Sequence, residues 1–99
     1  MGQCYDFVFS KDAEMIYISH LDLMRLFSRA ARRAGLPVEL TKGFNPHHQI
    51  KLKRALKLGL PSEREEGQIV LSSIMDECEL KEKWQKELPK GVEILEVKK

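Results

Sequence analysis

The chain has 99 residues, of which 42% are hydrophobic and 32% are charged, with few glycines and prolines. This composition is typical of one soluble globular domain, and it excludes a disordered tail, a collagen-like fibre and a disulfide scaffold. No apolar run approaches the roughly 20 residues of a membrane-spanning helix, so we expect no membrane association. The cysteines Cys4 and Cys78 lie far apart, which favours two reduced thiols in a cytoplasmic protein.

The first third of the chain predicts a strand followed by a well-defined helix. Alternating apolar residues predict a half-buried strand over 5–10, and residues 11–14 form a polar turn. Ser19 and Asp22 have the spacing of a capping box, and Gly35 is a typical helix terminator, so we expect a helix between them. Its apolar face consists of Leu23, Leu26, Phe27, Ala30 and Ala34.

The middle of the chain predicts short strands joined by loops. We expect a short strand over 38–40 and a loop over 41–48, which contains glycine and Asn-Pro. From 50 to 60, apolar and basic residues alternate as in a two-faced strand or strand pair. Residues 61–67 read as an acidic, turn-rich connection, and 68–74 as a strand.

The last part of the chain predicts a second helix and a final strand. Asp76 and Glu79 have the spacing of a second capping box, Pro89 and Gly91 end that helix, and a strand follows over 92–97. The apolar face of the second helix is Leu80, Trp84 and Leu88. The element order predicts a single α+β domain over 1–99 with the ferredoxin-like βαββαβ fold, in which two helices cover one face of an antiparallel sheet.

The net charge of +2 conceals an uneven distribution. Residues 20–60 contain nine lysines and arginines and only two acidic residues, whereas 1–19 and 61–99 are both acidic on balance. The basic residues form an arginine stripe on the first helix, a loop lysine and a lysine ladder on the following strand: Arg25, Arg29, Arg32, Arg33, Lys42, Lys51, Lys53 and Lys57. These residues form either solvated surfaces with an edge strand protected by lysine, or one surface that tracks phosphates.

A group of polar residues falls at the start of the first helix and in the 41–48 loop. They are His20, Asp22, Asn45, His47 and His48. Three kinds of chemistry fit: a metal site from His20, Asp22 and His47, acid–base cleavage of RNA by a histidine pair, or anion binding at the helix N-terminus. Capping alone explains Ser19 and Asp22, and a turn explains Asn45, so the histidines carry the stronger functional signal.

Several segments, taken in their order along the chain, resemble a known family, the radical-SAM-linked domain of unknown function. The segments are 9–11, 18–25, 29–30, 32–37 and 43–47. The resemblance implies a bacterial cytoplasmic protein that acts beside a B12-binding radical-SAM protein. The family domain is longer than this chain, which would then be its N-terminal half, and the chain departs from the family pattern over 48–53. Motif positions carried over are Ser19, His20, Asp22, Arg25, Arg29, Arg32, Arg33, Gly43, Asn45 and His47.

Our first hypothesis is therefore a non-enzymatic accessory module of a radical-SAM system that binds RNA or another phosphate-bearing substrate and needs no cofactor of its own. The residues expected to bind are Ser19, His20, Arg25, Arg29, Arg32, Arg33, Lys42, Asn45, His47, Lys51 and Lys53. The second is an enzyme, or half of one, that uses His20 and His47, with Asp22 as a further catalytic or metal-binding candidate. The third is a pure protein-interaction domain that docks on the radical-SAM partner.

Overall fold

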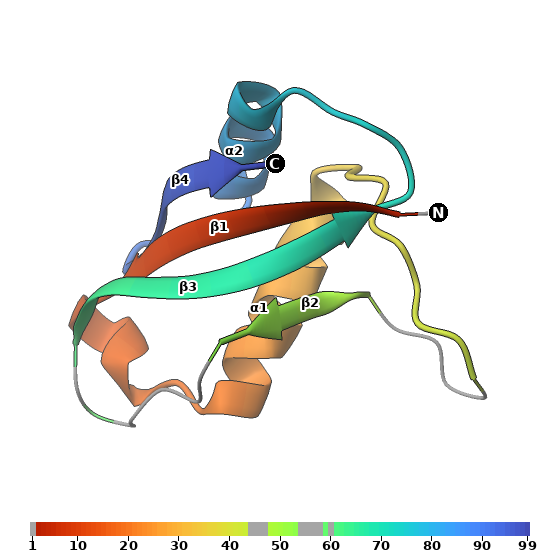
Figure 1. Cartoon of the computed structure of the whole chain (residues 1–99). Coiled ribbons are helices and arrows are strands. Elements are labelled where there is room, and N and C mark those ends of the chain that lie inside the picture. The colour runs from red at the N-terminus through yellow and green to blue at the C-terminus, as the bar shows by residue number, and fades with distance from the viewer. Residues whose placement is uncertain (1, 44–47, 54–58, 60) are drawn as a thin grey trace.

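The computed structural model describes residues 2–43, 48–53, 59 and 61–99. Two helices cover one face of a four-stranded antiparallel sheet in this part of the chain, and the strand order is β2-β3-β1-β4 (Figure 1). This order, with a helix in each crossover, is the ferredoxin-like arrangement that the sequence predicts. The elements are β1 (Gln3–Lys11), a 3-10 helix η1 (Ala13–Tyr17), α1 (His20–Arg33), β2 (Ile50–Leu52), β3 (Ser62–Leu71), α2 (Glu77–Lys86) and β4 (Val92–Lys98).

An aromatic cluster joins the sheet to both helices. Phe7 and Phe9 alternate along β1 toward the helices, and both are fully buried. The Phe7 ring meets Phe27 of α1 edge-on at 5.4 Å and Trp84 of α2 at 4.8 Å between ring centroids. The Trp84 indole also donates a hydrogen bond of 3.1 Å to the Phe27 carbonyl. This packing fixes α1 and α2 against the same face of the sheet and leaves the other face open.

Both helices begin where their sequence signals predict, and α1 also ends at its predicted signal. The second helix, α2, ends at Lys86, so Leu88 of its predicted apolar face lies just beyond the helix. The Ser19 hydroxyl accepts a hydrogen bond from the Asp22 amide, and the Asp76 carboxylate accepts from the amides of Cys78 and Glu79. Gly35 follows α1 with a φ of 72°, a conformation that glycine adopts without strain. The predicted apolar face of α1 is confirmed, with Leu23, Phe27, Ala30 and Ala31 buried and Leu26 and Ala34 packed at its margin.

The prediction of an acidic connection over 61–67 is wrong, because β3 begins at Ser62. This strand lies between β1 and β2, so its backbone pairs on both sides whatever its side chains are. Its outward residues, such as Arg64 and Glu66, are exposed on the open face of the sheet. Gly67 faces the core, where a Cβ atom would lie 2.6 Å from the Phe7 ring. The charged residues and the glycine of this central strand therefore make its composition look like that of a turn.

Other boundaries also differ from the sequence prediction. The predicted strand over 38–40 is limited to isolated bridges, Val38 with Leu71 and Leu40 with His48. The predicted strand over 50–60 is strand only in β2, and residues 54–58 and 60 lie outside the described residues. The strand expected over 68–74 ends at Leu71, and the polar turn after β1 leads into η1.

The outer edge of β4 is partly protected by a side chain of α2. The Gln85 amide donates to the Val92 carbonyl at 3.2 Å, and its oxygen accepts from the Ile94 amide. Gln85 thus pairs two backbone groups that an added strand would otherwise use. Among the described residues, no helix combines the length and the hydrophobicity needed to cross a bilayer.

Candidate nucleic-acid interface

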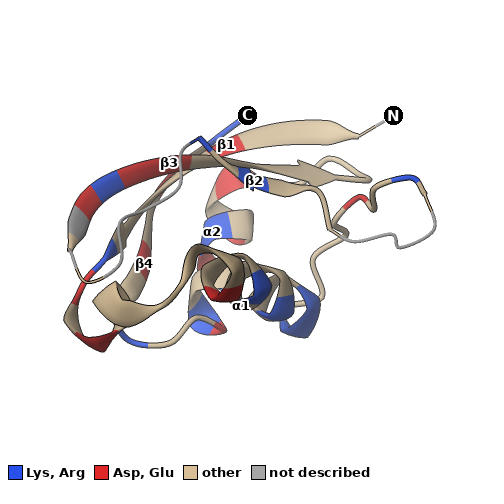
Figure 2. Ribbon diagram, turned by 90° about the horizontal axis from the view of Figure 1, so that it is seen from below, with Lys and Arg blue, Asp and Glu red and all other residues tan. Residues whose placement is uncertain are grey.

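Helix α1 presents its arginines to solvent on the side away from the core. Arg25, Arg29, Arg32 and Arg33 are all exposed, whereas Phe27 and Ala30 of the same helix are buried against the sheet. Basic residues gather along the outer side of the α1 ribbon in Figure 2. The predicted arginine stripe is therefore a real surface. Arg32 and Arg33 lie in the last turn of α1, where cations also interact favourably with the helix dipole.

Three of these arginines have no acidic partner among the described residues. Arg25 is the exception, since its Nη1 lies 3.6 Å from Asp22 Oδ1 within the first turns of the helix. No ion pair joins Arg29, Arg32 or Arg33 to a carboxylate in the described part of the chain. Their guanidinium groups carry a charge that is not neutralised locally. Such groups suit phosphate oxygens, which they can bind bidentately.

His48 links the end of the 41–48 loop to this helix. Its Nδ1 lies 2.7 Å from Ser28 Oγ, on the turn of α1 between Arg25 and Arg32. Partial burial lowers the pKa of His48 below its usual 6.5, the nearby Arg32 guanidinium lowers it further, and a hydrogen bond to the Ser28 backbone opposes both effects. The imidazole therefore favours its neutral form at neutral pH.

A hollow of about 370 Å³ lies beside this anchor, at the edge of the sheet. Its lining consists of Thr41, Lys42, His48, Gln49, Ile50 and Lys51. The side-chain amide of Gln49 donates to the Leu40 carbonyl, which ties the two sides of the loop together. The isolated bridge between Leu40 and His48 supports the same closure. The hollow thus combines basic side chains with an imidazole that contacts α1.

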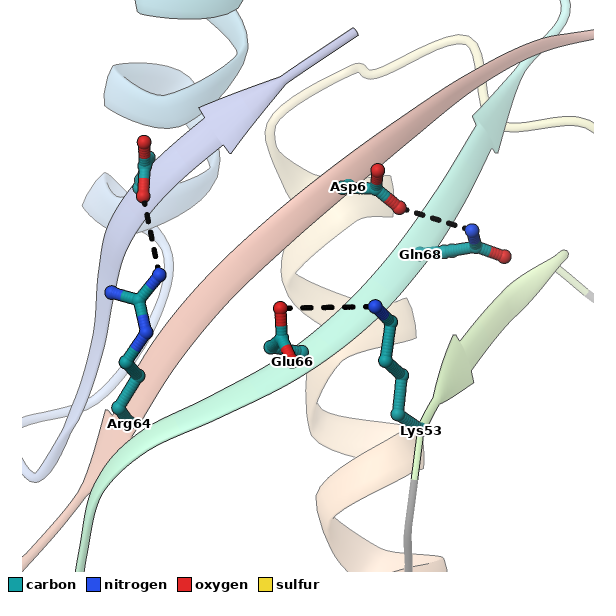
Figure 3. A network of polar contacts seen from close by, with 6 residues as sticks. Asp6, Lys53, Arg64, Glu66 and Gln68 are labelled. Atoms are coloured by element: carbon teal, nitrogen blue, oxygen red, sulfur yellow. Dashed lines mark hydrogen bonds and ion pairs between the residues drawn. The ribbon is translucent and has the colours of Figure 1, made fainter.

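The lysine ladder and the arginine stripe lie on different layers of the molecule. Ile50 faces the core, so Lys51 and Lys53 face the open side of the sheet, opposite the helices. Figure 3 shows Lys53 on that side, where its ammonium group lies 3.7 Å from Glu66. Lys57 lies outside the described residues. A ligand that touches both groups must therefore pass around the β2 edge, beside the hollow.

The remaining predicted site residues do not form a described cluster. His20 is exposed in the first turn of α1, while Ser19 caps the helix and Asp22 contacts Arg25. Eight residues separate His20 from Ser28, which corresponds to about 12 Å along a helix axis. Asn45 and His47 lie outside the described residues. Among those that are described, no group of three or more metal-ligating side chains occurs, so the His20–His47 site stays a prediction.

A comparison with known protein families identifies the family of this chain. Residues 5–99 match a family described as an uncharacterised protein conserved in bacteria (DUF2344). The chain belongs to this family. No curated protein and no solved structure matches the chain. Within this DUF2344 domain, the arginine surface of α1 and the adjoining hollow are therefore assigned from physical chemistry alone.

His48 is the site residue that the sequence reasoning undervalued. It was one of two neighbouring loop histidines, and the resemblance drew attention to His47 instead. A signal was present, because positions 48, 50 and 52 share one face by strand alternation, and Ile50 on that face is apolar. Extending the pattern back by two residues would have turned His48 toward α1, where Ser28 provides a polar partner.

Proposed function

We propose that this domain is a non-enzymatic accessory module that binds RNA through the arginine surface of α1, defined as Arg29, Arg32 and Arg33. The single observation that supports it is the exposure of all three side chains without an acidic partner among the described residues. Phosphate contacts by such residues release counterions, and they supply most of the affinity in non-specific nucleic-acid binding. The sequence motifs resemble a family that acts beside a radical-SAM protein. We therefore propose that a radical-SAM partner is the enzyme that acts on the bound RNA.

The aromatic residues indicate what kind of RNA binding to expect. Phe7, Phe9, Phe27 and Trp84 are buried in the core, and the Tyr5 hydroxyl is hydrogen-bonded to Met75. Tyr17, 68% exposed, is the one aromatic ring open to solvent in the described chain. Proteins that bind single-stranded nucleic acid by base stacking need several such rings. We therefore expect binding governed by phosphate, with strong salt dependence and little preference for base sequence.

The test is a salt titration of RNA binding. Fluorescence anisotropy with a short single-stranded RNA should give a log–log slope that the triple variant Arg29→Ala/Arg32→Ala/Arg33→Ala reduces by about 2, since each phosphate contact on a single strand contributes roughly 0.7. Alanine has the highest helix propensity, so α1 should persist, and circular dichroism checks this. We expect the affinity to fall at least tenfold for every RNA sequence tried.

A matched control removes the same charge from the open face of the sheet. Lys53, Arg64 and Lys98 each lie within 4 Å of a glutamate, so the triple variant Lys53→Ala/Arg64→Ala/Lys98→Ala should retain most of the salt slope. Equal losses in the two triple variants would contradict the proposal, because net charge rather than the α1 surface would then explain binding. A stable complex with the radical-SAM partner and no RNA affinity in any variant would favour the pure interaction domain.

A further inference from the structure

The two edges of the sheet differ in how their backbone groups are used. The outer edge of β4 is partly closed, because the Gln85 side chain pairs with the backbone of Val92 and Ile94. β2 pairs only with β3 in the described sheet, and no described side chain closes its outer edge. A strand edge with unpaired N–H and C=O groups is a template for a further strand. The β2 edge is therefore the side of the sheet at which another chain can pair.

The register between β2 and β3 shows which backbone groups point outward. The Lys53 amide donates to the Glu66 carbonyl at 3.0 Å, so the odd-numbered residues of this segment pair with β3. In an antiparallel pair, the residues between them turn their N–H and C=O groups away from the partner strand. In β2 these residues are Ile50 and Leu52. The Ile50 amide donates to the His48 carbonyl at 3.0 Å, which leaves the Ile50 carbonyl and both backbone groups of Leu52 without a partner in the described chain.

Two contacts give the direction of β2 beside α1. His48, just before β2, lies 2.7 Å from Ser28 in the middle of the helix. The Gly59 amide, beyond β2, donates to the Ile16 carbonyl at 2.6 Å, just before the helix begins. The chain therefore runs from the middle of α1 toward its N-terminal end, and Leu52 lies beside the first turns of the helix.

The helix side of this edge is apolar at that end. Leu52 shares the side of β2 that Ile50 turns toward the helices, and it is half-buried. Met24 and Ser28 are four positions apart on α1, so the half-buried Met24 lies on the helix side that faces β2. Leu21, three positions before Met24, is 58% exposed. Apolar surface therefore stays open to solvent beside the outward backbone of Leu52.

The open side of the same edge carries lysine. Lys51 is exposed and forms no ion pair with a described residue, and Lys53 lies 3.7 Å from Glu66 in an exposed pair of the weak kind. A second copy that paired through β2 would bring these lysines against the same lysines, which is destabilising. The lysines therefore oppose self-association, and they favour a strand with acidic residues on that side.

We propose that the β2 edge binds an extended segment of a partner protein as an added strand. Acidic side chains of the segment lie over Lys51 and Lys53, and the side chains between them are apolar and lie against Leu21 and Leu52. Strand alternation lets one segment present both kinds of residue, one to each face. Backbone pairing supplies affinity in such complexes, and the alternate side chains supply specificity. This inference goes beyond RNA binding, because it uses the backbone of β2 and leaves the arginine surface of α1 free.

The probe is a blocked, labelled peptide in which valine and glutamate alternate over eight positions. Fluorescence polarisation with the whole chain should show binding, and hydrogen exchange of the Leu52 amide should slow in the complex. A peptide of the same composition in the order Val-Val-Glu-Glu should bind at least tenfold more weakly, because it cannot separate the two residue types onto opposite faces. Equal binding of the two peptides, or no protection of the Leu52 amide, overturns the proposal.

Two variants test the backbone and the charge separately. Leu52→Pro removes an N–H that points away from β3, so the sheet should persist while peptide binding weakens about tenfold more than in Leu52→Ala, which keeps the N–H. Lys51→Glu should reverse the preference toward a Val-Lys peptide, whereas Lys86→Glu on α2, also exposed, should not. Equal effects within either pair contradict strand addition at β2. RNA affinity should be the same in Leu52→Pro and Leu52→Ala, so failure of this inference leaves the proposed function intact.

Discussion

The α1 surface and the open face of the sheet both expose basic side chains, but they differ in whether those side chains form ion pairs. On the sheet, Lys53 lies 3.7 Å from Glu66, and Arg64 and Lys98 lie 3.6 and 3.2 Å from Glu96. On α1, the three arginines of the proposed RNA surface have no such partner among the described residues. The two regions therefore differ in the pairing of their charges, and unpaired cations are the ones that remain available to a phosphate.

The cause of this difference is the way each element finds its neighbours. Residues on a helix surface meet others three or four positions away, and the arginine turns of α1 offer only Asp22. A strand instead meets residues from distant parts of the chain across the sheet, as Lys53 of the β2 end meets Glu66 of β3. Each exposed pair contributes only about 0–1 kcal/mol to stability. Its larger consequence is to neutralise the field that a phosphate would experience.

The largest stability effect is expected where the sheet meets the hollow. In Gly67→Ala, the new Cβ would lie 2.6 Å from Phe7 Cζ and 2.7 Å from the Lys51 carbonyl oxygen, so β2 or the Phe7 ring must shift. Such overpacking costs roughly 1–3 kcal/mol. Urea denaturation should show this loss, whereas RNA binding through α1 should persist, because α1 does not contact Gly67.

A neighbouring substitution provides the control for this prediction. Gln68 lies on the outward side of β3, and its amide donates to Asp6 at 3.0 Å on the open face (Figure 3). Gln68→Ala should change the free energy of unfolding much less than Gly67→Ala does. Equal stabilities of Gly67→Ala and the unmodified chain would show that β2 can move away from β3 at no cost, and the described register would then be wrong.

An intermediate effect is expected when the open face is made to resemble the α1 surface. Adding Glu66→Gln and Glu96→Gln to the triple arginine variant releases Lys53, Arg64 and Lys98 from their partners. We expect RNA affinity to recover several-fold, with a salt slope larger by about 1–2. Anisotropy titrations measure both quantities.

The control for this recovery keeps the same net charge. Glu77→Gln and Glu82→Gln, both on α2, change two exposed glutamates that form no ion pair with a described residue. If both pairs of substitutions restore binding equally, total charge is sufficient, and the contrast between the two regions has no functional meaning.

The smallest expected effect is a difference in the pH range over which each region loses stability. The pKa of His48 is lowered from 6.5 by burial and by Arg32, so the unfolded chain binds more protons and stability falls as the pH drops below about 6.5. The pKa of Glu96 is lowered from 4.5 by Lys98 and then Arg64, so its contribution is lost only as the pH falls below about 4.5.

Urea denaturation across a pH series separates these two contributions. His48→Gln should flatten the loss between pH 7.5 and pH 5.5, by less than about 1 kcal/mol because the ring is only partly buried. Glu96→Gln should act only at the lower pH, and weakly, since its carboxylate is screened by solvent. Identical pH profiles for the unmodified chain and for His48→Gln would contradict the assignment of the first transition to His48.

Much of the architecture could be predicted because its signals are local. Ser19 and Asp76 mark the helix starts, Gly35 marks the end of α1, and the spacing of Leu23 and Phe27 identifies the buried face. Each signal acts within one or two turns of helix, where backbone hydrogen bonds and side-chain spacing are set by neighbours in the sequence. The exposure of the arginine stripe followed from the same periodicity.

Other features depended on contacts between distant segments. β3 is a strand because β1 and β2 pair with it on both sides, although Glu63, Arg64 and Gly67 give it a turn-like composition. Two of the open-face ion pairs, Lys53 with Glu66 and Arg64 with Glu96, exist because the sheet brings residues of different strands together, whereas Lys98 and Glu96 lie two positions apart in β4. His48 joins the site because α1 offers Ser28 opposite it.

Local sequence signals were therefore enough to predict the helices, the fold class and the exposed arginine stripe of α1. Contacts between distant segments set which basic residues are neutralised, and they bring His48 against Ser28 of α1. The physical reason is that periodicity and capping are properties of adjacent residues. The pairing of charges and the burial of a central strand depend on which distant segments the folded sheet places side by side.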